Sequence, residues 1–262
     1  MSAARATTPV AVPILLYHSV SDAPRPGFDR WTVPRARFRE QVAAIAESGR
    51  TALTVSDLAA ALRRRSVPER AVVVTFDDGF LDTLDAVECL LDAGISATVY
   101  LTGGYLDQPG MLQRSDVATL AEAGSAVEIG AHSLTHRRLD ELPPAEIAHE
   151  LVGSRALVED LAQRDCNTFA YPHGSHDRRT VLAVRATGYS SATAVKNALS
   201  HAGDDPFALA RVTIEAGATT AFFDGTLNGR LRLARSAEAW RTRGYRWTRR
   251  LARRTTRRAT TS

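Results

Sequence analysis

The chain has 262 residues with a hydrophobic fraction of 44%, which is enough for one large domain with a buried core. Its two cysteines, Cys89 and Cys166, lie far apart, which argues against a disulfide framework and a cysteine-ligated metal site. The net charge of +4 is uneven: residues 230–262 hold twelve arginines and one acid and so carry +11, which leaves −7 on the rest. The basic character belongs to this tail, and we expect no specific nucleic-acid binding by the domain.

Strand-like and helix-like segments alternate along the chain. The predicted strands cover residues 14–18, 51–55, 71–76, 95–101, 126–129, 168–170, 189–194 and 209–215. The predicted helices cover residues 33–49, 57–65 (with Ser56 as the cap), 81–92, 115–123, 143–164, 177–187 and 219–227. This order predicts a parallel sheet with helices outside it, as a barrel or an open sheet. No strand is followed by a GxGxxG motif or a P-loop, so nothing favours a nucleotide site.

Two adjacent acids, Asp77 and Asp78, end the apolar strand that begins at Ala71. Successive side chains on a strand face opposite sides, so the two acids can serve one site only if the strand breaks there. Gly79 permits such a break. Buried acids are costly unless something pairs with them, and a metal ion is the obvious candidate.

Other polar residues also fall where predicted strands end. His132 and His136 follow one strand at a spacing that, on a helical turn, puts both imidazoles on one side. His18 ends the first strand, and the run Tyr171–Gly174 follows a later one. The carboxyl ends of parallel strands share one face of the fold, where ligands bind. Two histidines and a carboxylate suit zinc or a similar divalent ion.

These residues also carry a family resemblance. Thr75–Gly79 (TFDDG) and His132–His136 (HSLTH) resemble, in order and separation, the first two motifs of the polysaccharide deacetylase family (NodB homology, carbohydrate esterase family 4). Ile14–Val20, Phe169–Gly174 and Asp205–Arg211 resemble further family elements. The resemblance implies a distorted (β/α)7-type barrel of mostly parallel strands and a metal-dependent N- or O-deacylase.

The resemblance also implies roles for single residues. Asp77 would be the general base, and Asp78, His132 and His136 would hold a divalent metal, with zinc expected and cobalt, nickel or manganese as alternatives. The backbone N–H of His173 would stabilise the oxyanion. The contacts to substrate and oxyanion would come from Tyr171, Pro172, His173 and Gly174.

The chain departs from the family pattern at two points. Ala170 stands where many members have an arginine that orients the base. Arg211 resembles the arginine that compensates for this change in a variant subgroup. We therefore expect Arg211 to pair with Asp77. The alternative is that Arg211 is an ordinary surface arginine without a role in the site. Many members also have a Leu-x-His motif near the C-terminus whose histidine is the general acid, and this chain has none. His18 resembles the strand-end histidine that acts as the acid in enzymes that deacetylate poly-N-acetylglucosamine. The alternative is a structural histidine that only shapes the cleft. His173 is a second candidate, as acid or as substrate contact.

The chain divides into a loose arm (1–11), a catalytic domain (12–228) and a basic tail (229–262) in which aromatic residues and leucines alternate with arginines. Such a tail is typical of a helix that contacts an anionic membrane or another polyanion, or lies on the acidic body. No signal peptide or transmembrane segment is evident, so we expect a cytoplasmic protein, peripheral at the inner membrane face if the tail binds there.

Together these features favour a hydrolase that removes acetyl, or a similar small acyl group, from N-acetylated amino sugars of a polysaccharide, a glycolipid precursor or a glycosylated metabolite. One alternative is a hydrolase of other C–N bonds, in formamides or cyclic imides and ureides, on the same barrel. Another is a non-catalytic carbohydrate-binding protein. Trp31 and Tyr105, in predicted loops, are candidates for stacking on a sugar ring or for core packing.

Overall fold

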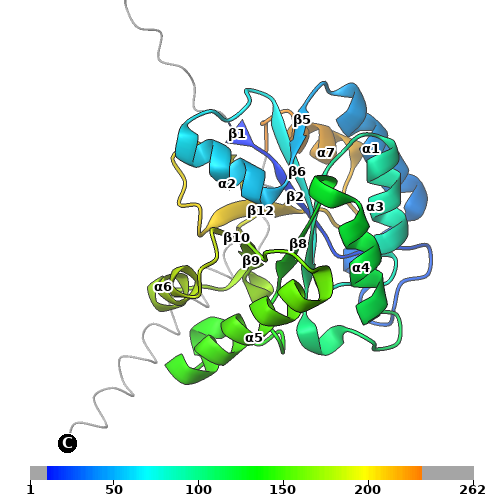
Figure 1. The fold of residues 1–262 in the computed structure, drawn as a ribbon. Coiled ribbons are helices and arrows are strands. Elements are labelled where there is room, and N and C mark those ends of the chain that lie inside the picture. The colour runs from blue at the N-terminus through cyan, green and yellow to red at the C-terminus, as the bar shows by residue number, and fades with distance from the viewer. Residues whose placement is uncertain (1–10, 232–262) are drawn as a thin grey trace, which may run out of the picture. The chain divides into compact units, whose positions relative to one another are not determined.

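The computed structural model describes residues 11–231, so the arm before them and the tail from 232 to 262 lie outside the described residues. Seven parallel strands close into a barrel, because β6 pairs with β2 (Figure 1). The distorted (β/α)7 barrel predicted from the sequence is therefore confirmed. In ring order the strands are β2 (Ile14–Tyr17), β12 (Leu209–Thr213), β10 (Ser191–Val195), β9 (Thr168–Ala170), β8 (Val127–Ala131), β7 (Ala97–Leu101) and β6 (Ala71–Phe76).

The ring is uneven, which is what distorts the barrel. Strands β8 and β9 are joined by the single pair Ala131 and Phe169, whereas β7 and β8 pair over five residues. Strand β6 has three neighbours, because β5 (Thr51–Leu53) pairs with its first half and β2 with its second half. Every residue of β6 is buried, as expected for a parallel strand covered on both faces.

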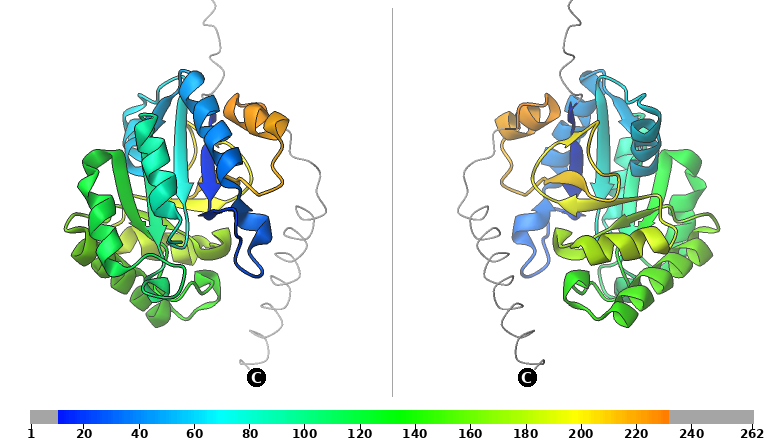
Figure 2. Two further views of the ribbon diagram at one scale, coloured as in Figure 1. Left: turned by 90° about the vertical axis from the view of Figure 1, so that its right-hand side faces the viewer. Right: turned by 90° about the vertical axis from the view of Figure 1, so that its left-hand side faces the viewer.

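Residues 11–231 form seven α-helices, six between strands and α7 after the last one. Most of them lie outside the barrel in the two side views (Figure 2). The seven helices are α1 (Arg35–Glu47), α2 (Val55–Arg64), α3 (Thr83–Asp92), α4 (Arg114–Glu122), α5 (Pro144–Ala162), α6 (Arg178–Ala186) and α7 (Thr220–Leu227). The short 3-10 helices are Asp29–Trp31, Gly103–Tyr105, Gly124–Ala126, Leu139–Glu141 and Pro172–Gly174. Short strands pair outside the ring: β1 (Ala11–Val12) with β11 (Ser200–His201), and β3 (Ser19–Val20) with β4 (Thr32–Val33).

Helix α2 closes the amino end of the barrel. Its Val55, Leu58 and Leu62 belong to one apolar cluster with residues at the starts of the strands, among them Ile14 and Leu209. The predicted cap of this helix was wrong by two residues: the Thr54 hydroxyl accepts the N–H of Asp57 at 3.2 Å. The Ser56 N–H instead donates to Glu128 at 3.1 Å. With the amino end filled, the carboxyl end is left for a site.

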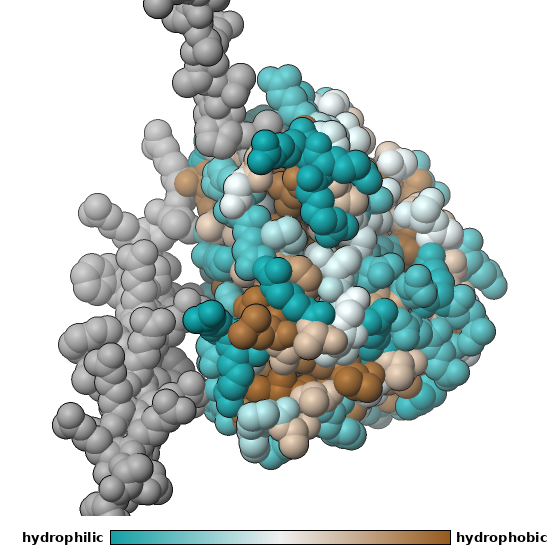
Figure 3. All heavy atoms as spheres, turned by 60° about the vertical axis from the view of Figure 1, so that its left-hand side comes forward, coloured by the Kyte–Doolittle hydropathy of each residue, from teal (hydrophilic) through white to brown (hydrophobic). Residues whose placement is uncertain are grey.

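The outer surface is mixed in character. Figure 3 brings the side of α5 and α6 forward and shows a few apolar groups among hydrophilic ones. The large exposed apolar side chains of these two helices are Val152 and Leu182. Scattered apolar residues of this kind are normal on a protein surface. None of the helices in residues 11–231 combines the length and apolar composition needed to cross a bilayer.

Candidate active site

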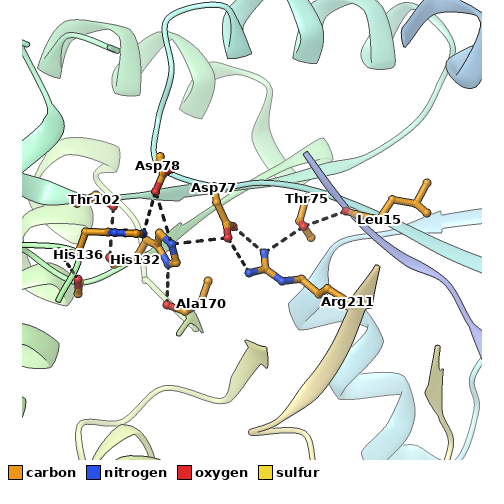
Figure 4. Close-up of polar contacts among 10 residues, drawn as sticks. Leu15, Thr75, Asp77, Asp78, Thr102, His132, His136, Ala170 and Arg211 are labelled. Atoms are coloured by element: carbon orange, nitrogen blue, oxygen red, sulfur yellow. Dashed lines mark hydrogen bonds and ion pairs between the residues drawn. The ribbon is translucent and has the colours of Figure 1, made fainter. Parts of the chain in front are cut away.

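The fold brings most of the predicted residues together at the carboxyl end of the barrel (Figure 4). Asp77 and Asp78 directly follow β6, His132 follows β8, and Arg211 lies in β12. His18 directly follows β2. Residues as far apart in the sequence as His18 and Arg211 thus meet because parallel strands end at one face.

The chain turns sharply after β6, so both acids face one cluster. Strand β6 ends at Phe76, and Asp78 and Gly79 have φ angles of 73° and 81°. Aspartate tolerates this left-handed conformation better than most residues. As a result, Asp77 Oδ2 and Asp78 Oδ1 both lie 3.6 Å from His132 Nε2. The break predicted at Gly79 is present, but it includes Asp78 itself.

Asp78, His132 and His136 form a group that could hold a metal ion. One ligand atom from each lies within 4.8 Å of the others, and Asp78 Oδ1 is 3.3 Å from His136 Nε2. Among the described residues, this buried oxygen has no hydrogen-bond donor. Burial, and then the Asp77 carboxylate, raise the pKa of Asp78 to about 7. Burial also lowers the pKa of His132, and lowers that of His136 to about 3.

The ring of His132 is fixed in a tautomer that suits a ligand. Its Nδ1 lies 2.8 Å from the carbonyl oxygen of Ala170. A carbonyl only accepts, so Nδ1 carries the proton and Nε2 presents its lone pair toward the two acids. Ligating histidines usually make such a hydrogen bond with the second ring nitrogen. At the position where the resemblance leads one to expect an arginine, Ala170 thus contributes its main-chain carbonyl.

The two histidines do not lie on a helical turn, so the predicted reason for their convergence was wrong. Residues 132–136 form a loop in which Ser133 and His136 have φ angles of 68° and 57°. The Ser133 hydroxyl accepts the N–H of His136 at 3.0 Å, and the two imidazole centroids are 4.9 Å apart. Of eight non-glycine residues with positive φ in the described chain, four are Asp78, Ser133, His136 and His173. Strain of this kind clusters at functional sites.

Arg211 makes the expected pair with Asp77. Its Nη1 and Nη2 donate to Oδ1 and Oδ2 at 2.6 and 2.7 Å, and both side chains are buried. Nη1 also donates to the Thr75 hydroxyl at 3.2 Å, which in turn donates to the carbonyl of Leu15. Burial raises the pKa of Asp77, but Arg211, with smaller contributions from His132 and His18, outweighs it, and the pKa falls to about 2. Thr75, for which the sequence motif predicted no separate role, therefore holds the arginine in place.

Three rings surround this centre. Burial lowers the pKa of His18 to about 4, against the opposing charge of Asp77. The buried Nδ1 of His18 has no hydrogen-bond partner within residues 11–231. The ring centroids of His173 and Tyr105 lie 4.5 and 5.6 Å from that of His136. These positions keep His18, His173 and Tyr105 as candidates for contacts with a substrate.

The remaining predicted residues shape the loop after β9. The Tyr171 hydroxyl donates to the carbonyl of Phe207 at 3.0 Å and its ring stacks on His176, so the side chain is engaged in packing. Pro172 and Gly174 are buried. At Gly174 a Cβ would lie 2.4 Å from the backbone nitrogen of Val195. The loop therefore needs glycine there to stay close to β10.

A closed parallel barrel with acids and histidines at its carboxyl end is the architecture of the NodB-type deacetylases, and comparison with known proteins agrees. Residues 64–192 match the sequence model of the family described as polysaccharide deacetylase. The Bacillus subtilis protein YxkH, whose name places it among the polysaccharide deacetylases, is 26% identical over 217 residues, covering 82% of this chain and 75% of its own. The chain is therefore similar to polysaccharide deacetylases over most of its described residues.

Solved structures show the same fold. A polysaccharide deacetylase from Bacillus cereus superposes with a TM-score of 0.74 at 25% identity, over 83% of this chain and 69% of its own. The deacetylase PplD of Streptococcus pyogenes superposes with a TM-score of 0.76 at 20% identity, over 85% and 99% of the two chains. The described barrel is therefore close to the whole of the second protein.

Proposed function

We propose that this protein is a divalent-metal-dependent deacetylase that removes acetyl, or a similar small acyl group, from N-acetylated amino sugars. The observation that carries the proposal is the group of Asp78, His132 and His136 beside a second, arginine-paired acid, Asp77. The family supports an acetylated carbohydrate as substrate. We favour a polysaccharide, a glycolipid precursor or a glycosylated metabolite as the molecule that carries the sugar.

The residues present fit a cation. Asp78 offers a buried oxygen without a donor, His132 offers a lone pair in a fixed tautomer, and burial keeps both histidines neutral. One carboxylate and two imidazoles suit zinc, with cobalt, nickel and manganese as alternatives. When bound, the metal polarises the acyl carbonyl and lowers the pKa of water.

Asp77 would act as the general base. With a pKa of about 2 it is ionised at neutral pH, and Arg211 holds both of its oxygens in place. The same ion pair makes Asp77 a weak base, so its contribution is the position of the carboxylate more than its affinity for protons. It would take a proton from the attacking water.

The leaving amine must then receive a proton, and His18 is our first candidate for the donor. Because burial lowers its pKa to about 4, the free ring is neutral at neutral pH. It would first have to receive a proton, such as the one that Asp77 takes from the water, and would then pass it to the amine. His173 is the second candidate, and its backbone N–H would donate to the oxyanion. Of these two rings, His173 lies next to the His136 ring.

The direct test is acetate release by the full chain after chelation and after return of zinc or cobalt. Monomeric, oligomeric and lipid-linked N-acetylglucosamine compounds serve as substrates. Formamides and cyclic imides in the same panel test the alternative hypothesis, a hydrolase of other C–N bonds. We expect release only with metal and only from acetylated sugars. Full activity without metal would refute the metal-dependent mechanism. Metal binding without acetate release from any compound would favour a non-catalytic carbohydrate-binding protein.

We also propose that the basic tail contacts an anionic surface. Residues 230–262 carry +11, with tryptophan, tyrosine and leucine between the arginines. Each basic residue near an anionic membrane contributes about 1 kcal/mol of binding free energy. Such contact would bring the enzyme to lipid-linked or surface-bound sugars at the cytoplasmic face.

A further inference from the structure

One acidic side chain lies on the apolar face of α5. This helix buries Ile147, Leu151 and Val158 at helical spacing, and Glu150 lies on the same face with 3% of its surface exposed. A charged residue in such a stripe is the sequence signal that could have drawn attention to it. A buried carboxylate is costly unless surrounding donors offset the lost hydration.

The donors to Glu150 come from the loop between the two histidines. Its Oε2 accepts the backbone N–H groups of Leu134 and Thr135 at 2.8 and 3.0 Å. Its Oε1 accepts the hydroxyl of Thr135. Hydrogen bonds to an ionised acceptor are about twice as strong as those between neutral groups. Glu150 therefore fixes the N–H side of this loop.

The other side of the loop is fixed by α5 and by the turn after β7. The carbonyls of Ser133 and Leu134 accept the N–H groups of Gly103 and Gly104 at 3.0 and 2.7 Å. The Leu134 side chain fills space that only glycine leaves free, since a Cβ on Gly153 would come within 2.6 Å of it. Anchoring on both sides is what holds the strained φ angles of Ser133 and His136.

We infer that Glu150 is a positioning residue, which holds the loop so that His132 and His136 both face Asp78 and thereby strengthens cation binding. The inference rests on the proposed function, because it concerns the same metal site. Glu150 acts through the backbone of the loop, whereas the partners known for ligating histidines usually bond the imidazole. Loss of such an outer partner lowers metal affinity about 10- to 100-fold.

The test compares the metal affinity of Glu150 variants by calorimetric titration of the chelator-stripped full chain with zinc. For Glu150→Ala we expect the dissociation constant to rise about 10- to 100-fold. For Glu150→Gln we expect a smaller rise, because the amide keeps one accepting oxygen. The matched control is Ser154→Ala, on the same buried face one turn later, whose hydroxyl contacts Leu151 and Tyr189. It should lower the melting temperature and leave the dissociation constant unchanged.

The outcomes separate this inference from the proposal on which it rests. If the unaltered chain binds no divalent cation, the proposed function fails. If the unaltered chain binds zinc and Glu150→Ala binds it equally well at a lower melting temperature, Glu150 is only structural and the inference is overturned. Should Glu150→Ala not fold, Glu150→Gln carries the test, and unchanged affinity in that variant has the same meaning.

Discussion

Replacement of Arg211 by methionine tests most directly how Asp77 is held. Arg211 donates two hydrogen bonds of 2.6 and 2.7 Å to Asp77 in a fully buried pair. Methionine fills part of the same space without a charge or a donor, and so leaves Asp77 buried without its main partner. Removal of one member of a buried pair costs about 3–5 kcal/mol. That is a large share of a total stability of roughly 5–15 kcal/mol.

The pKa of Asp77 gives a second, pH-dependent estimate. It is lowered from 3.8 to about 2, which corresponds to roughly 2 kcal/mol at neutral pH. Because the folded value lies below the unfolded one, this stabilisation is complete above the unfolded pKa and is lost as the pH falls through about 2. Without Arg211, burial remains as the largest influence and raises the pKa of Asp77. The acid limb of the deacetylation rate should then move to higher pH.

The assay combines urea unfolding at neutral pH with the pH profile of acetate release. Arg211→Met, Asp77→Asn and the double variant complete a cycle, and we expect the cost of Arg211→Met to shrink when Asp77 is already asparagine, because the two residues are coupled. An Arg211→Met variant that unfolds like the parent, with its acid limb in the same place, would refute the view that Arg211 orients the base.

Three further predictions concern the base, the loop after β9 and the tail. The Asp77→Asn variant should keep its zinc affinity in calorimetric titration, but its turnover should fall about 10²- to 10⁴-fold. Unchanged turnover would show that Asp77 is not the general base. Gly174→Ala should lower the free energy of unfolding by about 1–3 kcal/mol, since its Cβ would meet Val195, whereas Gly203→Ala, with open space around it, should be neutral. Equal urea midpoints would contradict this. In co-sedimentation the full chain should bind anionic vesicles, less so at high salt, through residues 230–262; equal binding to neutral vesicles would argue against a charge-driven contact.

The β–α order could be predicted because its signals are local and repeated, whereas the barrel was implied by the family resemblance. The buried run that makes β6 and the helix patterns between strands already give the β–α order. Strand ends then place the acids and histidines on one face without any knowledge of contacts. Closure of the ring could not be read in this way, since it depends on β2 pairing with β6 across some 60 residues.

The detailed geometry of the site depended on contacts that no local pattern encodes. The HxxxH spacing favours a helix, but the loop takes its shape from Glu150 and from the glycines after β7. Thr54 and Ser56 are both good caps by residue type, and the choice between them was made by Glu128, which engages the Ser56 N–H. Thr75 looks like any strand residue until Arg211 reaches it.

The two adjacent acids differ because their surroundings differ. Asp77 and Asp78 share a strand end and burial, yet the pKa of Asp77 falls to about 2 while that of Asp78 rises to about 7. Arg211 bonds both oxygens of Asp77 and so satisfies that charge within the protein. Within residues 11–231, Asp78 Oδ1 has no hydrogen-bond donor. The imidazole nitrogens of His136 and His132 lie 3.3 and 3.6 Å from it, and burial keeps both rings neutral. The proposed cation would therefore be held at Asp78, and Asp77 would be left free for the proposed proton transfer.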